Sequence, residues 1–219
     1  SSSNANAGGG VVCGRLRIAP AAGVTVRDFK DGDLTAGGVD NQDDRDRIEV
    51  GTTLELGYAV RRGIEGFVRG EYDFSNYDQA LDDDGVNRDA DSWRVLAGVN
   101  VDITRLIEAS AGIGVGQRIP EDPSFSTVTD IAADVGVTWS ITPLTTINFD
   151  AQRAFQETTI AGASSVTNTS VQLGVSHDLL RNFNLNAGLA YSHRDFEENA
   201  RVDNLYSLTV GADWEPMRL

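Results

Sequence analysis

The stretch TVTDIAADVGVTWSITPLTTINFDAQRAFQE, at residues 127–157, reads as two long strands joined by a tight turn. From residue 130 to residue 141 the odd positions are apolar, whereas the even positions are small or polar. After Thr142 and Pro143 the alternation resumes, with Ile147 on the apolar face and Asp150 on the polar face. A period of two residues predicts strands with one apolar face.

The polar face of this hairpin is too acidic for the core of a soluble sandwich, because it carries Asp130, Asp134 and Asp150. An apolar outer band, a polar inner face and an aromatic residue near the turn, here Trp139, are typical of strands with lipid outside and polar groups inside. The same alternation runs through residues 47–61. We therefore expect the even positions of 47–61 and the odd positions of 127–142 to face lipid.

Length and composition agree with an all-β protein. The chain has 219 residues, 23 glycines, 5 prolines and 40% hydrophobic residues, which fits one β-domain or barrel better than a helical protein. It lacks the run of about 18 apolar residues that a transmembrane helix needs, whereas a barrel strand needs only about 9–11 residues. The net charge of −15 leaves no basic face for nucleic acid. Cys13 is the single cysteine, so no disulfide can form within the chain.

The chain as a whole predicts an all-β fold, namely an antiparallel up-and-down transmembrane β-barrel, a meander of about ten strands. Residues 1–14 are expected to form a flexible lead-in, and residues 15–219 the barrel. Tight turns are predicted at 61–63, 104–105, 142–143 and 181–182, and they alternate with long polar loops, as in outer-membrane barrels. The predicted strands cover about 15–29, 47–61, 64–77, 93–103, 107–116, 127–142, 145–157, 171–179, 183–191 and 205–214.

Two details refine this plan. Pro20 removes a backbone donor from the first strand, which suits a sheet edge, a bulge or a seam. The glycine row at 112, 114 and 116 indicates crowding or sharp curvature in the wall. The alternative is a soluble β-sandwich with aromatic residues in its core, but strands of about 12–15 residues are long for it, since about 5–6 is usual.

Several segments carry a resemblance to a known family. They are EYDFSNYD at 71–78, NRDADSWRVLAGVNVDITRLIEASAGIGVGQR at 87–118, VTWSITPLTTINFDAQRAFQET at 137–158, VSHDLLRNFNLNAGLAYSHRDFEENARVDN at 175–204 and GADWEP at 211–216. From about Gly66 onward the chain resembles the putative β-barrel porin 2 group of outer-membrane barrels, which are often found with exopolysaccharide synthesis and export systems. Members are usually longer, and this chain stops at Leu219 without the terminal aromatic residue common in such barrels. It therefore either closes at ten strands or forms part of a larger barrel.

The resemblance implies a bacterial outer-membrane location and a porin-like role in the export or passage of polysaccharide or small solutes. The alternative is a structural or anchoring barrel whose lumen is filled by side chains and which supports a partner complex in the envelope. The expected partners are outer-membrane lipid, lipopolysaccharide and a periplasmic polysaccharide-export or envelope protein, and no nucleic acid. No enzymatic activity and no cofactor are expected.

Parity along the strands assigns side chains to the lumen and to the membrane interfaces. The expected lumen-facing acidic residues are Glu49, Glu55, Glu71, Asp102, Glu108, Asp130, Asp134 and Asp150, and the expected lumen-facing basic residues are Arg69 and Arg94. The expected aromatic girdle consists of Tyr72, Trp93, Trp139, Phe183, Tyr191 and Trp214. Acids outnumber arginines at inward positions, so we expect a negative lumen that favours cations or neutral sugars.

The candidate catalytic and metal sites have simpler interpretations. His177 and Asp178 form a pair of the kind used by outer-membrane proteases, but parity points His177 outward beside a turn. The acidic segments 40–46 and 82–91 could collect calcium, yet neither has EF-hand spacing. We therefore expect no catalytic residue and no metal site. Arg153 is expected to face outward and to contact a lipid phosphate or Glu157.

Overall fold

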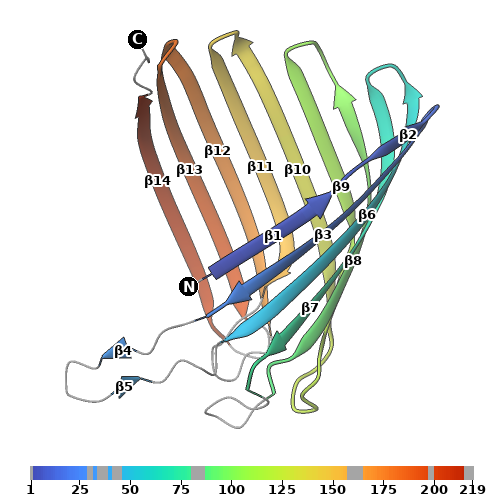
Figure 1. Ribbon diagram of the computed structural model, residues 1–219, viewed down its shortest axis with the longest axis vertical. Helices are drawn as coiled ribbons and strands as arrows, with labels where there is room; N and C mark the ends of the chain where they lie inside the picture. The colour runs from blue at the N-terminus through green and yellow to red at the C-terminus, as the bar shows by residue number, and fades with distance from the viewer. Residues whose placement is uncertain are drawn as a thin grey trace.

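The computed structural model consists of long antiparallel strands in one strongly curved sheet (Figure 1). It describes residues 2–28, 32–33, 39–40, 46–79, 87–156, 165–196 and 200–214. Every regular element within these ranges is a β-strand. None of the described residues belongs to a helix long and apolar enough to cross a membrane.

The ten predicted strands and their meander order are confirmed. They are β3 (Leu16–Arg27), β6 (Arg47–Arg61), β7 (Ile64–Tyr77), β8 (Ala90–Asp102), β9 (Ile107–Pro120), β10 (Val128–Thr142), β11 (Thr145–Gln156), β12 (Val166–Leu180), β13 (Phe183–Phe196) and β14 (Val202–Trp214). Each pairs antiparallel with the next along the chain. The four predicted turns fall between paired strands, and Gly63 supports the first of them with a φ of 74°.

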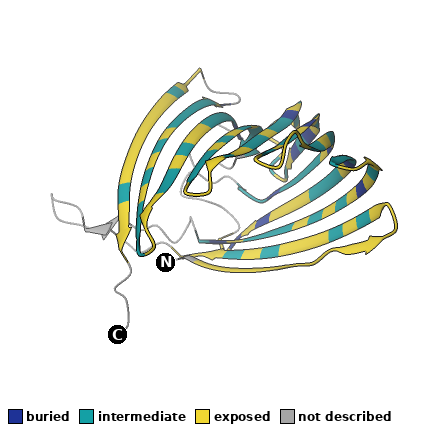
Figure 2. Cartoon of the chain, turned by 90° about the horizontal axis from the view of Figure 1, so that it is seen from above, coloured by how far each residue is buried: buried dark blue, intermediate teal, exposed yellow. Residues whose placement is uncertain are grey.

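The sheet has 12 strands, since β1 (Ser2–Gly8) and β2 (Val11–Cys13) both pair with β3. Its order runs from β1 through β3 and β6 to β14, so β1 and β14 form its two edges among the described residues. Seen from above, the sheet is strongly curved, so that it has a concave and a convex face (Figure 2). The short strands β4 (Gly32–Asp33) and β5 (Val39–Asp40) pair only with each other.

The expected flexible lead-in differs from the structure, in which residues 2–8 and 11–13 are strands. The free side of β3 offers backbone donors and acceptors to these small residues, and each segment takes up part of it. Pro20 lies at the break between them, where the Gly9 N–H donates to the Pro20 carbonyl at 3.1 Å. Because Pro20 lacks an N–H on this side of β3, the pairing is interrupted there.

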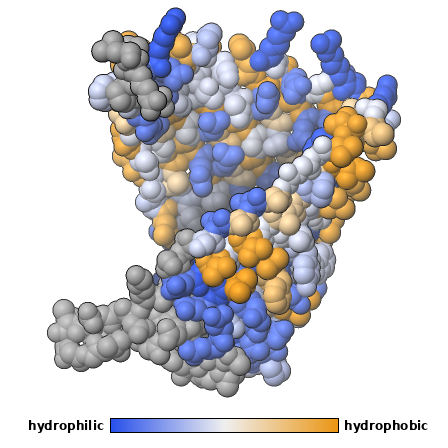
Figure 3. Space-filling model, viewed as in Figure 1, coloured by the Kyte–Doolittle hydropathy of each residue, from blue (hydrophilic) through white to orange (hydrophobic). Residues whose placement is uncertain are grey.

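The two faces of the sheet differ as the alternation predicts. Along β10, Ile131 is 56% exposed on one face while the adjacent Ala132 is 3% exposed on the other. Large apolar side chains on the convex face stay exposed, among them Leu54, Leu56 and Leu189. In Figure 3 hydrophilic side chains gather on the inner, concave side of the sheet, and hydrophobic side chains lie along the outer side of the sheet. An apolar outer face on long antiparallel strands is the arrangement of a barrel in lipid.

The predicted glycine row lies on β9, beside β8, where strands two apart in the sheet, β8 with β10 and β9 with β11, contact each other. A Cβ atom at Gly98 would come within 2.3 Å of the Ala111 carbonyl oxygen, and one at Gly114 within 1.8 Å of the Val95 carbonyl oxygen. Only glycine allows the neighbouring backbones to approach so closely. The Phe67 ring covers Gly98, and Leu96 is fully buried nearby. This corner therefore buries Phe67 and Leu96 on the concave face, while Val166 and Phe196 form a separate buried cluster.

Candidate functional site

A group of ion pairs lies on the concave face, next to the close approach of β8 and β9. The Arg17 guanidinium from β3 contacts Glu55 on β6 and lies 2.6 Å from Glu65 on β7. The Arg69 Nε lies 2.6 Å from the other oxygen of Glu55. Glu55 therefore joins two arginines, and its side chain is only 12% exposed. The alternating parity of β3, β6 and β7 brings these charges to one face, because their strands are neighbours in the sheet.

Arg69 also reaches across two strands. Its Nη1 lies 3.4 Å from Asp134 on β10, although β8 and β9 separate the two strands. Its guanidinium carbon lies 5.0 Å from the centre of the Phe67 ring. Such a contact requires a sharply concave sheet, since strands lie about 4.8 Å apart. Beside it, the Arg94 Nε donates to Glu71 at 2.7 Å. We call Arg17, Glu55, Glu65, Arg69, Glu71, Arg94 and Asp134 the ion-pair network.

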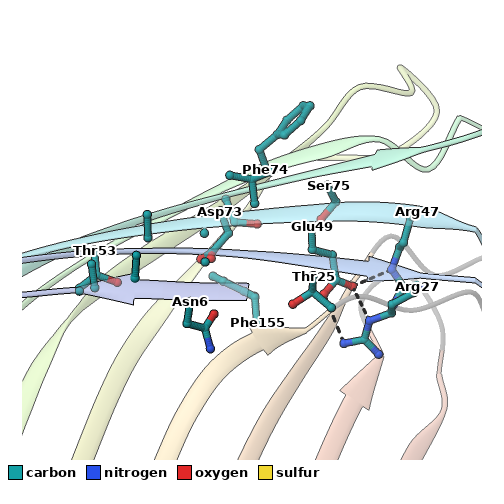
Figure 4. A pocket seen from close by; sticks show the side chains of 18 of the residues that line it. Asn6, Thr25, Arg27, Arg47, Glu49, Thr53, Asp73, Phe74, Ser75 and Phe155 are labelled. Atoms are coloured by element: carbon teal, nitrogen blue, oxygen red, sulfur yellow. Dashed lines mark hydrogen bonds and ion pairs between the residues drawn. The ribbon is translucent and has the colours of Figure 1, made fainter. Parts of the chain in front are cut away.

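A cavity of about 920 Å³ opens on the concave face toward the end of the strands that carries the long loops (Figure 4). Arg27, Arg47 and Arg118 line it together with Glu49, Asp73 and the ring of Phe155. Glu49 lies between two of the arginines, 3.0 Å from Arg27 and 2.7 Å from Arg47. Arg118 is 5% exposed and donates to Ser92 at 3.3 Å. Arginines thus gather at this end although the chain carries −15 overall.

A smaller cavity of about 320 Å³ lies toward the tight turns. It is lined by Asp102, Glu108 and Asp150, with Asn100 and Thr138 between them. No arginine belongs to its lining. The charged side chains that line the concave face therefore include several arginines at the loop end and only acidic residues in the turn-end cavity.

The predicted lumen-facing residues are thus distributed over four places. The structure brings Glu55, Glu71, Asp134, Arg69 and Arg94 into the ion-pair network. It places Glu49 in the loop-end cavity and Asp102, Glu108 and Asp150 in the turn-end cavity. Asp130 stands apart and contacts Arg153.

The predicted aromatic residues lie on two levels of the sheet. Near the loop end Tyr72 is directly opposite Trp93, whose Nε1 donates to Gln117 at 3.1 Å. The Tyr72 hydroxyl donates to Asp91 at 2.9 Å. Near the turns Phe183 is directly opposite Trp214. The remaining two are Trp139, 43% exposed beside the β10–β11 turn, and Tyr191, whose ring lies 5.0 Å from that of Tyr206.

Both histidines have hydrogen-bond partners within the sheet. His177 Nδ1 lies 2.9 Å from the Thr145 hydroxyl, and His193 Nδ1 lies 2.9 Å from Asn204 Oδ1. Within the described ranges no cluster of His, Cys, Asp and Glu is arranged to hold a metal ion. Residues 41–45 and 82–86 of the two acidic segments lie outside those ranges, as does Glu157, one of the two expected partners of Arg153.

Asp122, in the connection between β9 and β10, fastens a loop at the rim. Its carboxylate accepts a hydrogen bond from the Ser124 hydroxyl. It also accepts hydrogen bonds from the backbone N–H of Ser124 at 2.8 Å and from the backbone N–H of Asn87 at 3.0 Å. These hydrogen bonds to the charged form hold the pKa of Asp122 below its usual range. Residue 87 and the turn at 122–124 are thereby tied together.

Three residues of the loop-end cavity were not predicted. Arg47 shares the parity of Glu49, so alternation alone could have identified it. Arg118 was missed because β9 runs to Pro120, beyond the predicted end at residue 116. Phe155 has the parity of the lipid-facing residues, yet its ring lies 3.3 Å from the Cβ position of Gly116 on the concave side. The β10–β11 ladder ends at Arg153, so β11 lacks a partner on that side where Phe155 turns inward.

Comparisons with known proteins agree with this architecture. The family model described as putative beta-barrel porin 2 matches residues 1–219, a longer match than the resemblance noted from residue 66. No curated protein matches the chain. Among solved structures, the TodX monoaromatic hydrocarbon channel (deltaS2 mutant) is 10% identical with a TM-score of 0.52, over 98% of this chain and 73% of that one. The FrpB iron transporter from Neisseria meningitidis (F3-3 variant) is also 10% identical, with a TM-score of 0.46 over 98% of this chain. This chain spans 43% of the length of FrpB.

Proposed function

Because this chain belongs to the putative beta-barrel porin 2 family, which matches its whole length, we propose that it forms the wall of a conduit through the bacterial outer membrane. The chain is an outer-membrane β-barrel protein with a porin-like fold. In our proposal the concave face lines the lumen, and small hydrophilic solutes or polysaccharide chains pass along it. Outward passage of polysaccharide would make it part of an export system.

The observation that carries this proposal is the opposite polarity of the two faces. The convex face exposes apolar side chains, whereas the concave face holds the ion-pair network and two polar cavities. Arginine or lysine on the lipid side of a barrel costs about 2–4 kcal/mol at the bilayer midplane, and acidic residues cost less, so this polarity selects lipid for the convex face and water for the concave one. A polar, water-bearing wall is what a hydrophilic solute needs.

The proposed partners follow from the same placement. Lipid surrounds the convex face, and the long-loop end faces outside because tight turns of such barrels lie in the periplasm. The part of the barrel at Tyr72 and Trp93 would then contact lipopolysaccharide. The end with the tight turns would contact a periplasmic export or envelope protein. The role requires no catalysis and no cofactor, so we propose that the protein is not an enzyme.

One observation favours a second candidate, a structural barrel whose lumen is filled. The ion-pair network and the core around Phe67 and Leu96 occupy the concave side of β6–β10. A narrow barrel filled in this way would anchor a partner rather than conduct. The carved cavity of about 920 Å³ on the same face supports the conduit instead.

Planar-bilayer recording of the natural full-length protein tests the proposal. A conduit gives stepwise conductance, and its reversal potential in a salt gradient reports the sign of the wall charge. Cation preference is expected from the acidic excess. An insertion-competent, folded protein that never conducts would reject the conduit in favour of the structural barrel.

A further inference from the structure

Charge is distributed unevenly over the concave face. The ion-pair network and the arginines of the loop-end cavity all lie on β3 and β6–β10. The central concave positions of β11–β14 are instead mostly amides and hydroxyls. We call six of them the amide strip: Asn148, Gln152, Ser170, Gln172, Ser192 and Ser207.

The register places these side chains in adjoining rows. Gln152 is opposite Ser170, which is opposite Ser192 on the next strand. One row further, Asp150 is opposite Gln172. On β11–β14, Asp150 is the single charged side chain among the described residues of these two rows and of the row of Asn148; Asp134 of the ion-pair network lies opposite Gln152 on β10, and Arg194 lies one row beyond Ser192. Neighbouring side chains of the strip are thus about 6.8 Å apart along a strand and about 4.8 Å apart across strands.

Much of the hydrogen-bonding capacity of the strip is unused. The side chains of Gln152 and Gln172 are exposed, and neither side-chain amide forms a hydrogen bond with another described residue. Each of these amides offers two donors and one acceptor oxygen. Beside them Gly174 and Gly188 leave room, because Cβ atoms there would meet nothing nearer than 3.8 Å. The strip therefore presents accessible amide and hydroxyl groups to the lumen, whereas the arginines of the network are already bound to carboxylates.

We infer that the amide strip is a binding track for uncharged, polyhydroxylated solutes, of which neutral oligosaccharides are the chemical class. This inference rests on the proposed conduit and names its solute and the side chains that hold it. A sugar hydroxyl both donates and accepts, as do the amides and hydroxyls of the strip, so every contact can be satisfied. An anionic solute gains no cationic partner on the strip and is repelled by Asp150.

The test measures sugar binding separately from conductance. Titration calorimetry with the detergent-solubilised full-length protein uses maltotriose as the neutral probe and trigalacturonate as the acidic one. The double variant Gln152→Met and Gln172→Met keeps side-chain length and removes the hydrogen bonds. Gln117→Met, on the convex face, is the matched control. The resistance of each folded protein to SDS without heating establishes that the variants fold, and the single variants replace the double one if it does not.

The expected result is that maltotriose binds several-fold more tightly than trigalacturonate. The double variant should bind it about tenfold more weakly, the size expected from one or two lost hydrogen bonds, while Gln117→Met is unchanged. Equal maltotriose binding in the folded double variant, or tighter binding of the acid, overturns the inference. Absence of conductance with strip-dependent binding would reject the conduit alone. Conductance without strip-dependent binding would reject the track alone.

Discussion

Substituting alanine for Gly114 tests whether the β8–β9 corner is as sharp as the structure makes it. The added Cβ would lie 1.8 Å from the Val95 carbonyl oxygen and 2.7 Å from its carbon. Both distances are far inside the ~3.5 Å at which nonbonded atoms pack best. The obstructing atoms belong to the backbone of the paired strand, so no side-chain rotation can relieve the overlap. The two strands must separate, which weakens ladder hydrogen bonds on either side.

We expect Gly114→Ala to lower the free energy of unfolding by about 3 kcal/mol, the upper part of the range for overpacked sites. Gly188→Ala is the matched control, because it also lies at a concave position of an interior strand. Its Cβ would have ordinary contact, 3.8 Å from the Leu173 carbonyl oxygen. That variant should be unchanged or more stable by up to about 1 kcal/mol, through the reduced freedom of its unfolded chain.

Urea unfolding in lipid vesicles measures both variants against the parent protein, with midpoints compared at equal slope. A Gly114→Ala protein as stable as the parent would refute the close approach of β8 and β9. Equal losses in the two variants would show that alanine is disfavoured on this face in general, and the argument from curvature would fail.

Three other outcomes are expected. Leu173→Arg should lower the free energy of unfolding in vesicles by about 2–4 kcal/mol, whereas Gln172→Arg, on the opposite face of the same strand, should lower it much less. Equal losses in the two variants would contradict the assignment of faces. Arg69→Gln removes the cation shared by several carboxylates, so the reversal potential of the conducting protein should move toward stronger cation preference, while Arg69→Lys should move it little. The lowered pKa of Asp122 means that its tie to Asn87 contributes fully above the usual carboxyl pKa of about 3.9 and is lost as the pH falls through the lower folded value, so amide protection at Asn87 should fall in that acidic range. Asp122→Asn should show the reduced protection already at neutral pH.

The positions of strands, turns and faces could be predicted because each depends on residues close in the chain. Alternation along β6 and β10 identified the apolar convex side, and the tight turns near residues 62, 104, 143 and 181 followed from the breaks between alternating runs. Local signals failed where a ladder begins or ends. They did not predict β1 and β2, the extension of β9 to Arg118, or the inward ring of Phe155.

Local alternation along the chain is sufficient to predict which side chains face the membrane and which charges lie on the concave face, since side-chain direction in a strand has a fixed period of two. Which of those charges meet depends on the curvature of the whole sheet. Arg69 reaches Asp134 across two strands only because the glycines of β8 and β9 let the sheet bend sharply between them. Curvature accumulates from the twist and close approach of many paired strands, which no single stretch of sequence encodes. The same curvature divides the wall into a paired, charged side and the open amide strip.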